Sequence, residues 1–121
     1  MITKRLLQMA VAYLVFGILI GLGMGISGKF ALILVHVHLN LLGWATMALM
    51  ALIYKAYPEA AATVLAKVHF WMHGLGLPPL MIALAVLMSG NTGADPFVGV
   101  FSLITGIGVL AYCVNILRFI R

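Results

Sequence analysis

Two histidines, an asparagine and a tryptophan stand close together inside a long apolar stretch of the chain. They are His36, His38, Asn40 and Trp44, in the segment HVHLNLLGW at residues 36–44. Polar side chains at membrane depth are costly and usually mark a site. Because neutral imidazole binds iron, copper and zinc, the segment predicts a cofactor or metal site with the two histidines as ligands.

A second pair of histidines, His69 and His73, is spaced four residues apart. This spacing places both on one helical face with Gly76, and it can hold a transition metal. For His73 the roles of metal ligand, proton relay and contact between helices stay open, and for His69 the alternative to a metal ligand is an interfacial histidine beside Trp71. Just beyond it, Pro78 and Pro79 predict a kink that frees backbone carbonyls, which a neighbouring helix must then satisfy.

The composition predicts a membrane protein. Hydrophobic residues make up 65% of the 121 residues and charged residues only 7%, so the chain needs lipid around it as a partner. The formal net charge is +5, but the basic residues lie at the edges of apolar runs. This is the pattern of membrane topology signals, and it argues against a nucleic-acid partner. The single cysteine, Cys113, can form no intrachain disulfide.

Four stretches are long and apolar enough to be membrane-spanning helices, which need about 20 residues each. They cover residues 6–26, 31–54, 68–88 and 97–120, and the short connectors between them carry glycine, proline or charged residues. The sequence therefore predicts an all-α membrane protein, with a single four-helix transmembrane domain over residues 1–121.

The basic residues are divided unequally between the two predicted sides. The side of the termini and the second connector holds Lys4, Arg5, Lys55, Lys67, Arg118 and Arg121, and the other side holds Lys29. By the positive-inside rule we expect both termini to be cytoplasmic, in an inner membrane of bacterial type. His36 then lies about 9 Å deep from the outer end of its span, at 1.5 Å per residue.

Helical geometry separates the two histidines of the first segment. Positions two residues apart differ by about 200° around a helix, so His36 and His38 face nearly opposite ways and cannot share one metal. His36 lies on one face with Asn40 and Gly43, and we expect Gly43 to leave room for a flat group. Asn40 would orient a ligand and Trp44 pack on it, or both would make contacts between helices. Each face is predicted to form one wall of a separate pocket, and the alternative is that both histidines hydrogen-bond neighbouring helices in the bundle.

The motifs of the second and third spans resemble a known family. The run HVH at 36–38, LGW at 42–44 and IY at 53–54 ahead of Pro58 is similar to the tenth span of the catalytic subunit of haem-copper oxidases, closest to C-family oxidases and nitric oxide reductases. The HFW at 69–71 resembles the start of their eleventh span. In that family the first histidine ligates the high-spin haem and the second a low-spin haem. The resemblance implies haem b ligation by His36 and His38.

The chain also departs from that family. The family's catalytic subunit has three similar arcs of four spans, and this chain has the equivalent of one arc. The copper-ligating histidines and the cross-linked tyrosine of the other arcs have no counterparts here, so reduction of oxygen or nitric oxide is not carried over. Whether the chain is an oxidoreductase stays open.

One arc cannot close a pocket around a macrocycle, so a homo-oligomer is expected. In a head-to-tail ring, His36 of one protomer would face His38 of the next, and three copies would rebuild the family's pseudo-threefold plan. A haem held in this way would be six-coordinate and low-spin. A five-coordinate haem on one histidine is the other arrangement left open. Two stripes of small residues could be packing seams within or between chains: Gly17, Gly21 and Gly25, and Gly99, Ser102 and Gly106.

Two classes of function follow from the sequence. The first is a b-type haem membrane protein that passes electrons to a redox partner or senses a diatomic gas. The alternative is a copper- or zinc-binding membrane protein for metal delivery or oxidase assembly. The chain has no C-x-x-C-H motif, so covalent c-type haem attachment is excluded.

Overall fold

Four long helices make up the chain. The structure is a computed structural model and describes residues 1–120. The helical stretches Ile2–Ser27, Ile33–Ala56, Val64–Met88 and Thr92–Phe119 are each long and apolar enough to cross a membrane. The predicted all-α fold with four candidate spans is therefore confirmed. The first residue of each span differs from the one predicted from the sequence.

The first and last spans are single helices. The first span is α1 (Ile2–Ser27), which ends at Gly28 in the left-handed conformation with φ of 68°, a common way to stop a helix. The fourth span joins a short 3₁₀ turn, η3 (Thr92–Ala94), to α7 (Asp95–Phe119).

A π-helical turn interrupts each of the two middle spans. The second span runs through α2 (Ile33–His38), η1 (Leu39–Ala45) and α3 (Thr46–Ala56). The third runs through α5 (Val64–His69), η2 (Phe70–Gly74) and α6 (Leu77–Met88). Such turns are rare and occur frequently at functional sites. Both lie within the histidine motifs, and the sequence pattern did not predict them.

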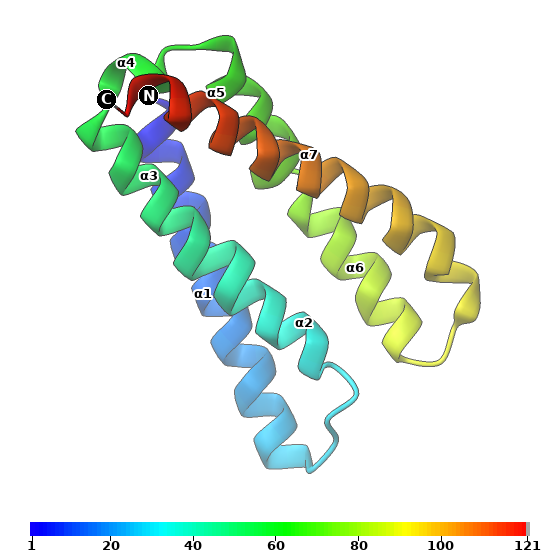
Figure 1. Cartoon of the computed structure of the whole chain (residues 1–121). Helices are drawn as coiled ribbons and strands as arrows, with labels where there is room; N and C mark the ends of the chain where they lie inside the picture. Colours follow the sequence, from blue (N-terminus) through cyan, green and yellow to red (C-terminus); the bar gives the residue numbers. More distant parts are fainter. Residues whose placement is uncertain (121) are drawn as a thin grey trace.

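The spans pack as two groups (Figure 1). α1 lies along η1 and α3, while α7 lies along α5, η2 and α6. Both termini and the short helix α4 (Pro58–Ala61) lie at the same end of the molecule, and the two groups diverge toward the other end. The predicted position of the termini beside the second connector is thus confirmed. Arg121 lies outside the described residues.

The buried core and the outer surface are both apolar. Leu6, Met47, Tyr54 and Leu77 are fully buried between the helices. Large apolar side chains on the outside are left exposed, among them Phe16, Leu41, Leu103 and Leu117. A surface of this kind is stable where lipid chains surround it, which agrees with four candidate membrane spans.

The third span is broken just before Pro78 and Pro79, which stand at the start of α6. In a regular helix the Gly74 carbonyl would accept a hydrogen bond from the N–H of residue 78, but proline has no N–H. The Tyr13 hydroxyl of α1 donates to this carbonyl instead. The prediction that a neighbouring helix satisfies a freed carbonyl is confirmed here, and Tyr13 is the side chain that does so.

Candidate functional site

His36 lies on α2 against the glycines of α1. Its Nδ1 is 2.7 Å from the Gly17 carbonyl oxygen, and because a carbonyl can only accept, Nδ1 carries the proton. Nε2 then holds the free lone pair, and it has no hydrogen-bond partner among residues 1–120. Asn40 donates to the His36 carbonyl at 2.8 Å, which fixes the amide one turn below the ring.

His38 has the same arrangement on another face of the helix. Its Nδ1 is 2.7 Å from the Leu34 carbonyl oxygen. The proton is therefore on Nδ1, and Nε2, across the ring, is directed away from the backbone of its own helix. A histidine that ligates a metal usually donates its other ring N–H to a carbonyl or carboxylate, which fixes the tautomer. Both His36 and His38 meet this condition.

The two histidines line different hollows. His36 borders a hollow of about 480 Å³. Its other wall is α1, through Ile18, Gly21, Leu22, Gly25 and Ile26. His38 borders a hollow of about 430 Å³ between the two groups of spans. The walls there include Leu42, Leu80, Ser102, Thr105 and Gly106. No single metal ion within one chain can bind both imidazoles in this arrangement.

The glycine stripe of α1 makes room for this site. A Cβ atom on Gly21 would lie 2.7 Å from His36 Cε1, and one on Gly17 would lie 2.6 Å from Asn40 Nδ2. These two glycines therefore form a seam within the chain. Gly25, by contrast, has no neighbour within 4 Å of such a Cβ.

The surroundings of Gly43 differ from the sequence expectation. A Cβ atom on Gly43 would lie 2.7 Å from Tyr13 Cβ. The space that was expected to admit a flat group is thus filled by Tyr13, and the glycine serves close packing of η1 on α1. Trp44 is half-buried and packs against the apolar core. Neither Gly43 nor Trp44 lines the hollows next to His36 and His38.

His69 and His73 are fully buried and hydrogen-bonded to each other. His73 Nε2 lies 3.0 Å from the Leu42 carbonyl oxygen, so Nε2 carries the proton and Nδ1 accepts. The donor to Nδ1 is His69 Nε2, at 3.0 Å. Both ring nitrogens of His73 are therefore engaged, which leaves no lone pair for a metal ion. His69 Nδ1 has no hydrogen-bond partner within the described chain.

The two π turns, η1 and η2, position the two partners of the hydrogen bond between His73 and the Leu42 carbonyl. Thr46 N–H donates to Leu41 O, five residues back, so it does not take the Leu42 carbonyl as it would in an α-helix. That carbonyl accepts from His73, which itself lies in η2. Gly108 of α7 permits the close approach from the other side, since a Cβ there would lie 2.3 Å from His73 N.

Two tyrosines complete a buried polar cluster around His69. The Tyr54 and Tyr112 rings lie 5.7 Å and 5.1 Å from the His69 ring, and 5.2 Å from each other, between centroids. Both hydroxyls are buried without a hydrogen-bond partner in residues 1–120. The sequence pattern predicted no role for either tyrosine. Both tyrosines could have been noticed in the sequence, because each is a polar side chain within an apolar span, as the histidines are.

Asn115 is a further buried polar residue, for which the sequence pattern predicted no role. It is fully buried on α7, donates to the Ala60 carbonyl at 2.8 Å and accepts from Thr63 Oγ1 at 2.9 Å. Thr63 in turn accepts from Ala66 N–H at the start of α5. Asn115 therefore fastens the connector between the second and third spans to the fourth span.

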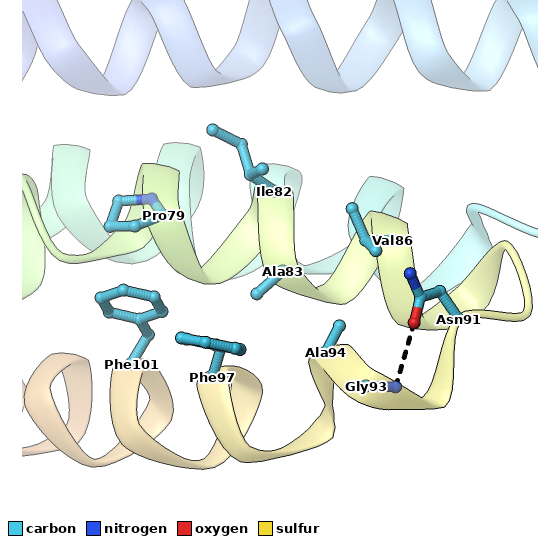
Figure 2. A pocket seen from close by; sticks show the side chains of 9 residues that line it. All are labelled: Pro79, Ile82, Ala83, Val86, Asn91, Gly93, Ala94, Phe97 and Phe101. Atoms are coloured by element: carbon cyan, nitrogen blue, oxygen red, sulfur yellow. Dashed lines mark hydrogen bonds between the residues drawn. The ribbon is translucent and has the colours of Figure 1, made fainter.

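The apolar hollow in Figure 2 holds no candidate for chemistry. It lies between α6 and the start of α7, has a volume of about 400 Å³, and is lined mainly by aliphatic and phenylalanine side chains. Its polar side chain, Asn91, accepts from Gly93 N–H at 3.0 Å and is thus already engaged. Across the described residues, no group of three or more His, Cys, Asp or Glu side chains could hold a metal ion.

No protein family, curated protein or solved structure matches this chain. The likeness to haem-copper oxidases therefore rests on the residue motifs alone.

Proposed function

We propose that this chain is a b-type haem-binding membrane protein in which His36 and His38 are axial ligands to haem iron. One observation carries the proposal. Both imidazoles hold their Nδ1 proton against a backbone carbonyl, at 2.7 Å in each case, and present a free Nε2. Packing of the helices does not require two imidazoles with a free Nε2 within one helical turn. The HVH…LGW motif, which resembles the haem-copper oxidases, adds support.

The chemistry of the two hollows suits a macrocycle with an iron centre. Neutral imidazole is a common haem ligand, and the walls around both histidines are mainly aliphatic, with glycines at Gly21 and Gly106. A bound haem would supply a redox-active iron. The residues of the chain would hold it, fix the tautomer of each ligand through Gly17 and Leu34, and keep water from its faces.

A ring of identical chains follows from the two hollows. Each hollow is open to the outside, so one protomer encloses neither of them alone. In a head-to-tail ring the His36 side of each protomer lies against the His38 side of the next, so every free Nε2 has a counterpart. Three copies would match the plan of the resembling family. Native mass spectrometry should find a haem-loaded trimer, and a stable haem-loaded monomer would contradict the ring.

Ligation by two histidines leaves the iron without an open position, which favours electron transfer to a redox partner over gas binding. A five-coordinate haem on one histidine would leave room for a diatomic gas. By the distribution of the basic residues, we place the protein in an inner membrane of bacterial type with both termini cytoplasmic.

An absorption spectrum of the purified protein tests the proposal. A Soret band with sharp α and β bands after reduction is expected from low-spin haem b. A colourless protein that carries copper or zinc would contradict haem binding and favour the alternative, a metal-delivery or oxidase-assembly protein. The wild-type chain should be purified after expression with added haem precursor, so that incomplete loading does not imitate a colourless protein.

A further inference from the structure

Lysines from three different spans line one hollow at the end of the molecule where the termini lie (Figure 1). The hollow has a volume of about 830 Å³, with walls from α1, α3, α4 and α5. Among residues 1–120, its charged side chains are Lys4 of α1, Lys55 of α3 and Lys67 of α5. The amide of Gln8 on α1 adds a further hydrogen-bond donor. All four side chains are exposed, so a group outside the chain can reach them.

No acidic side chain balances these three positive charges within the hollow. The chain has two acidic residues, Glu59 and Asp95. Neither of them lines the hollow, although Glu59 belongs to α4, which forms part of its wall. A cleft that is lined by charges of one sign, with apolar walls beside them, concentrates ions of the opposite sign. The lysines therefore favour an anion in this hollow.

An exposed tryptophan next to the hollow indicates its depth in the membrane. Lys67 also lines a second hollow, of about 200 Å³, together with Arg5 and Trp71. The Trp71 side chain is 63% exposed, and it stands four residues after Lys67, which is about 6 Å along the span. Exposed tryptophans are enriched where the hydrocarbon meets the lipid headgroups. The lysines therefore lie at the level of the headgroups, where the abundant anion is a lipid phosphate.

The remaining walls of the 830 Å³ hollow also favour a lipid over a free ion. They include the apolar side chains of Ile2, Leu7, Pro58 and Ala61. A phospholipid can place its phosphate near the lysines and its glycerol and first methylene groups against these side chains. Inorganic phosphate would contact the lysines and leave the apolar wall facing water, which is unfavourable.

We propose that this hollow binds the headgroup of an anionic phospholipid, whose phosphate accepts hydrogen bonds from the ammonium groups of Lys4, Lys55 and Lys67. Basic pockets between membrane helices bind headgroups of this kind. Because three ammonium groups converge here, a headgroup with two phosphates neutralises more of the charge than a headgroup with one. The inference does not depend on haem binding, because none of the three lysines lines the hollows next to His36 and His38.

The bound lipid links the two groups of spans. Lys4 and Lys55 belong to the group that contains α1 and α3, whereas Lys67 belongs to the group that contains α5 and α7. A phosphate between them replaces repulsion among the lysines by attraction to one shared anion. A ligand that binds only the folded chain raises its stability, so anionic lipid should raise the melting temperature of the protein.

Lipid titration of the purified full chain in an uncharged detergent tests the site. Cardiolipin, with two phosphates, is the anionic probe, and phosphatidylcholine is the zwitterionic one. Native mass spectrometry measures lipid binding, and circular dichroism measures thermal unfolding. We expect cardiolipin to bind at least tenfold more tightly than phosphatidylcholine and to raise the melting temperature. Equal binding and equal stabilisation by the two lipids would overturn the proposal.

Inorganic phosphate, added at the same phosphate concentration, distinguishes a lipid site from a site for free phosphate. Sodium chloride at equal ionic strength is the control for screening. Neither salt should raise the melting temperature as cardiolipin does. A rise with inorganic phosphate equal to the rise with cardiolipin would show that the hollow takes the free ion, and the lipid proposal would be wrong.

Two double variants that lose the same charge separate the hollow from general surface charge. Lys55→Gln/Lys67→Gln removes one lysine from each group of spans. It should weaken cardiolipin binding at least tenfold, because each lysine near an anionic lipid contributes roughly fivefold. Lys29→Gln/Arg118→Gln is the matched control, since both side chains are exposed and neither lines the hollow, and it should bind as the wild type does.

Equal weakening in the two double variants would overturn the site, because any loss of positive charge would then have the same effect. Circular dichroism at low temperature shows whether each variant is folded. If Lys55→Gln/Lys67→Gln does not fold, the two substitutions are measured singly, and each should weaken cardiolipin binding roughly fivefold. Wild-type affinity in both single variants would also contradict the proposal.

Discussion

His73 Nε2–H donates a hydrogen bond to the Leu42 carbonyl over 3.0 Å, and this bond joins the π turn of the third span to the π turn of the second. The turn of the second span provides the acceptor of this hydrogen bond and the turn of the third span provides the donor. The first leaves a carbonyl that Thr46 does not take, and the second carries the ring that reaches it. Leu42 also lines the hollow next to His38, so the buried histidine pair and the candidate haem site share one residue.

His73→Ala should destabilise the fold while leaving the haem in place. The substitution leaves the Leu42 carbonyl and His69 Nε2 without partners, at about 1–3 kcal/mol for each buried group. Thermal unfolding followed by circular dichroism in detergent measures the loss. Because His73 contacts neither His36 nor His38, the low-spin spectrum and midpoint potential should change little. Loss of haem from a folded His73→Ala protein would show that the four histidines form one site.

His36→Ala and His38→Ala should each remove the haem or convert it from low-spin to high-spin, because each variant lacks one axial ligand. The absorption spectrum of the reduced protein is the measurement, with His73→Ala as the histidine control. Low-spin haem at wild-type occupancy in either variant would contradict ligation by the pair. Helical content by circular dichroism should stay at the wild-type level in both.

Gly21→Ala should disturb the haem site although Gly21 is not a ligand. The added Cβ would lie 2.7 Å from His36 Cε1, so the ring must move away from its bond to Gly17. We expect a lower haem occupancy or a mixed-spin spectrum. Gly23→Ala is the matched control on the same helix, because no atom lies within 4 Å of the added Cβ and Gly23 does not line the hollow next to His36. Equal spectra for the two variants would mean that His36 is not held by this seam.

Gly108→Ala should be among the most destabilising single substitutions in the chain. Its Cβ would lie 2.3 Å from His73 N, a backbone atom that cannot move without shifting the whole span. Overpacking of this kind costs about 1–3 kcal/mol and occasionally more. Gly99→Ala, nine residues earlier on α7, meets no atom within 4 Å, does not line the hollow next to His38, and should unfold close to the wild-type temperature. If both variants melt alike, α7 does not approach the third span as described.

Tyr13→Phe should lower stability by about 1–3 kcal/mol, because the Gly74 carbonyl loses its donor and Pro78 cannot replace it. Thermal unfolding compares it with Tyr57→Phe, which alters an exposed tyrosine. An unchanged melting temperature for Tyr13→Phe would indicate that the carbonyl finds another donor in the broken third span.

The four spans, the common end of the termini and the opposed faces of His36 and His38 could be read from the sequence. Each depends on properties within one span or at its ends, namely apolar length, the position of charges and the rotation of about 100° per residue in a helix. The break before Pro78 belongs to this group as well, since proline removes a backbone donor wherever it stands.

The contacts that complete the site were decided by the tertiary structure. The Tyr13 bond to Gly74 joins residues 61 positions apart, and the His73 bond to Leu42 joins residues 31 positions apart. The sequence placed Gly43 beside an open space, but α1 packs there and fills it with Tyr13. Which helix lies against which face depends on the packing of all four spans together, whereas helical periodicity describes one span at a time. For that reason the meeting of Tyr54, His69 and Tyr112 became visible only in the folded chain.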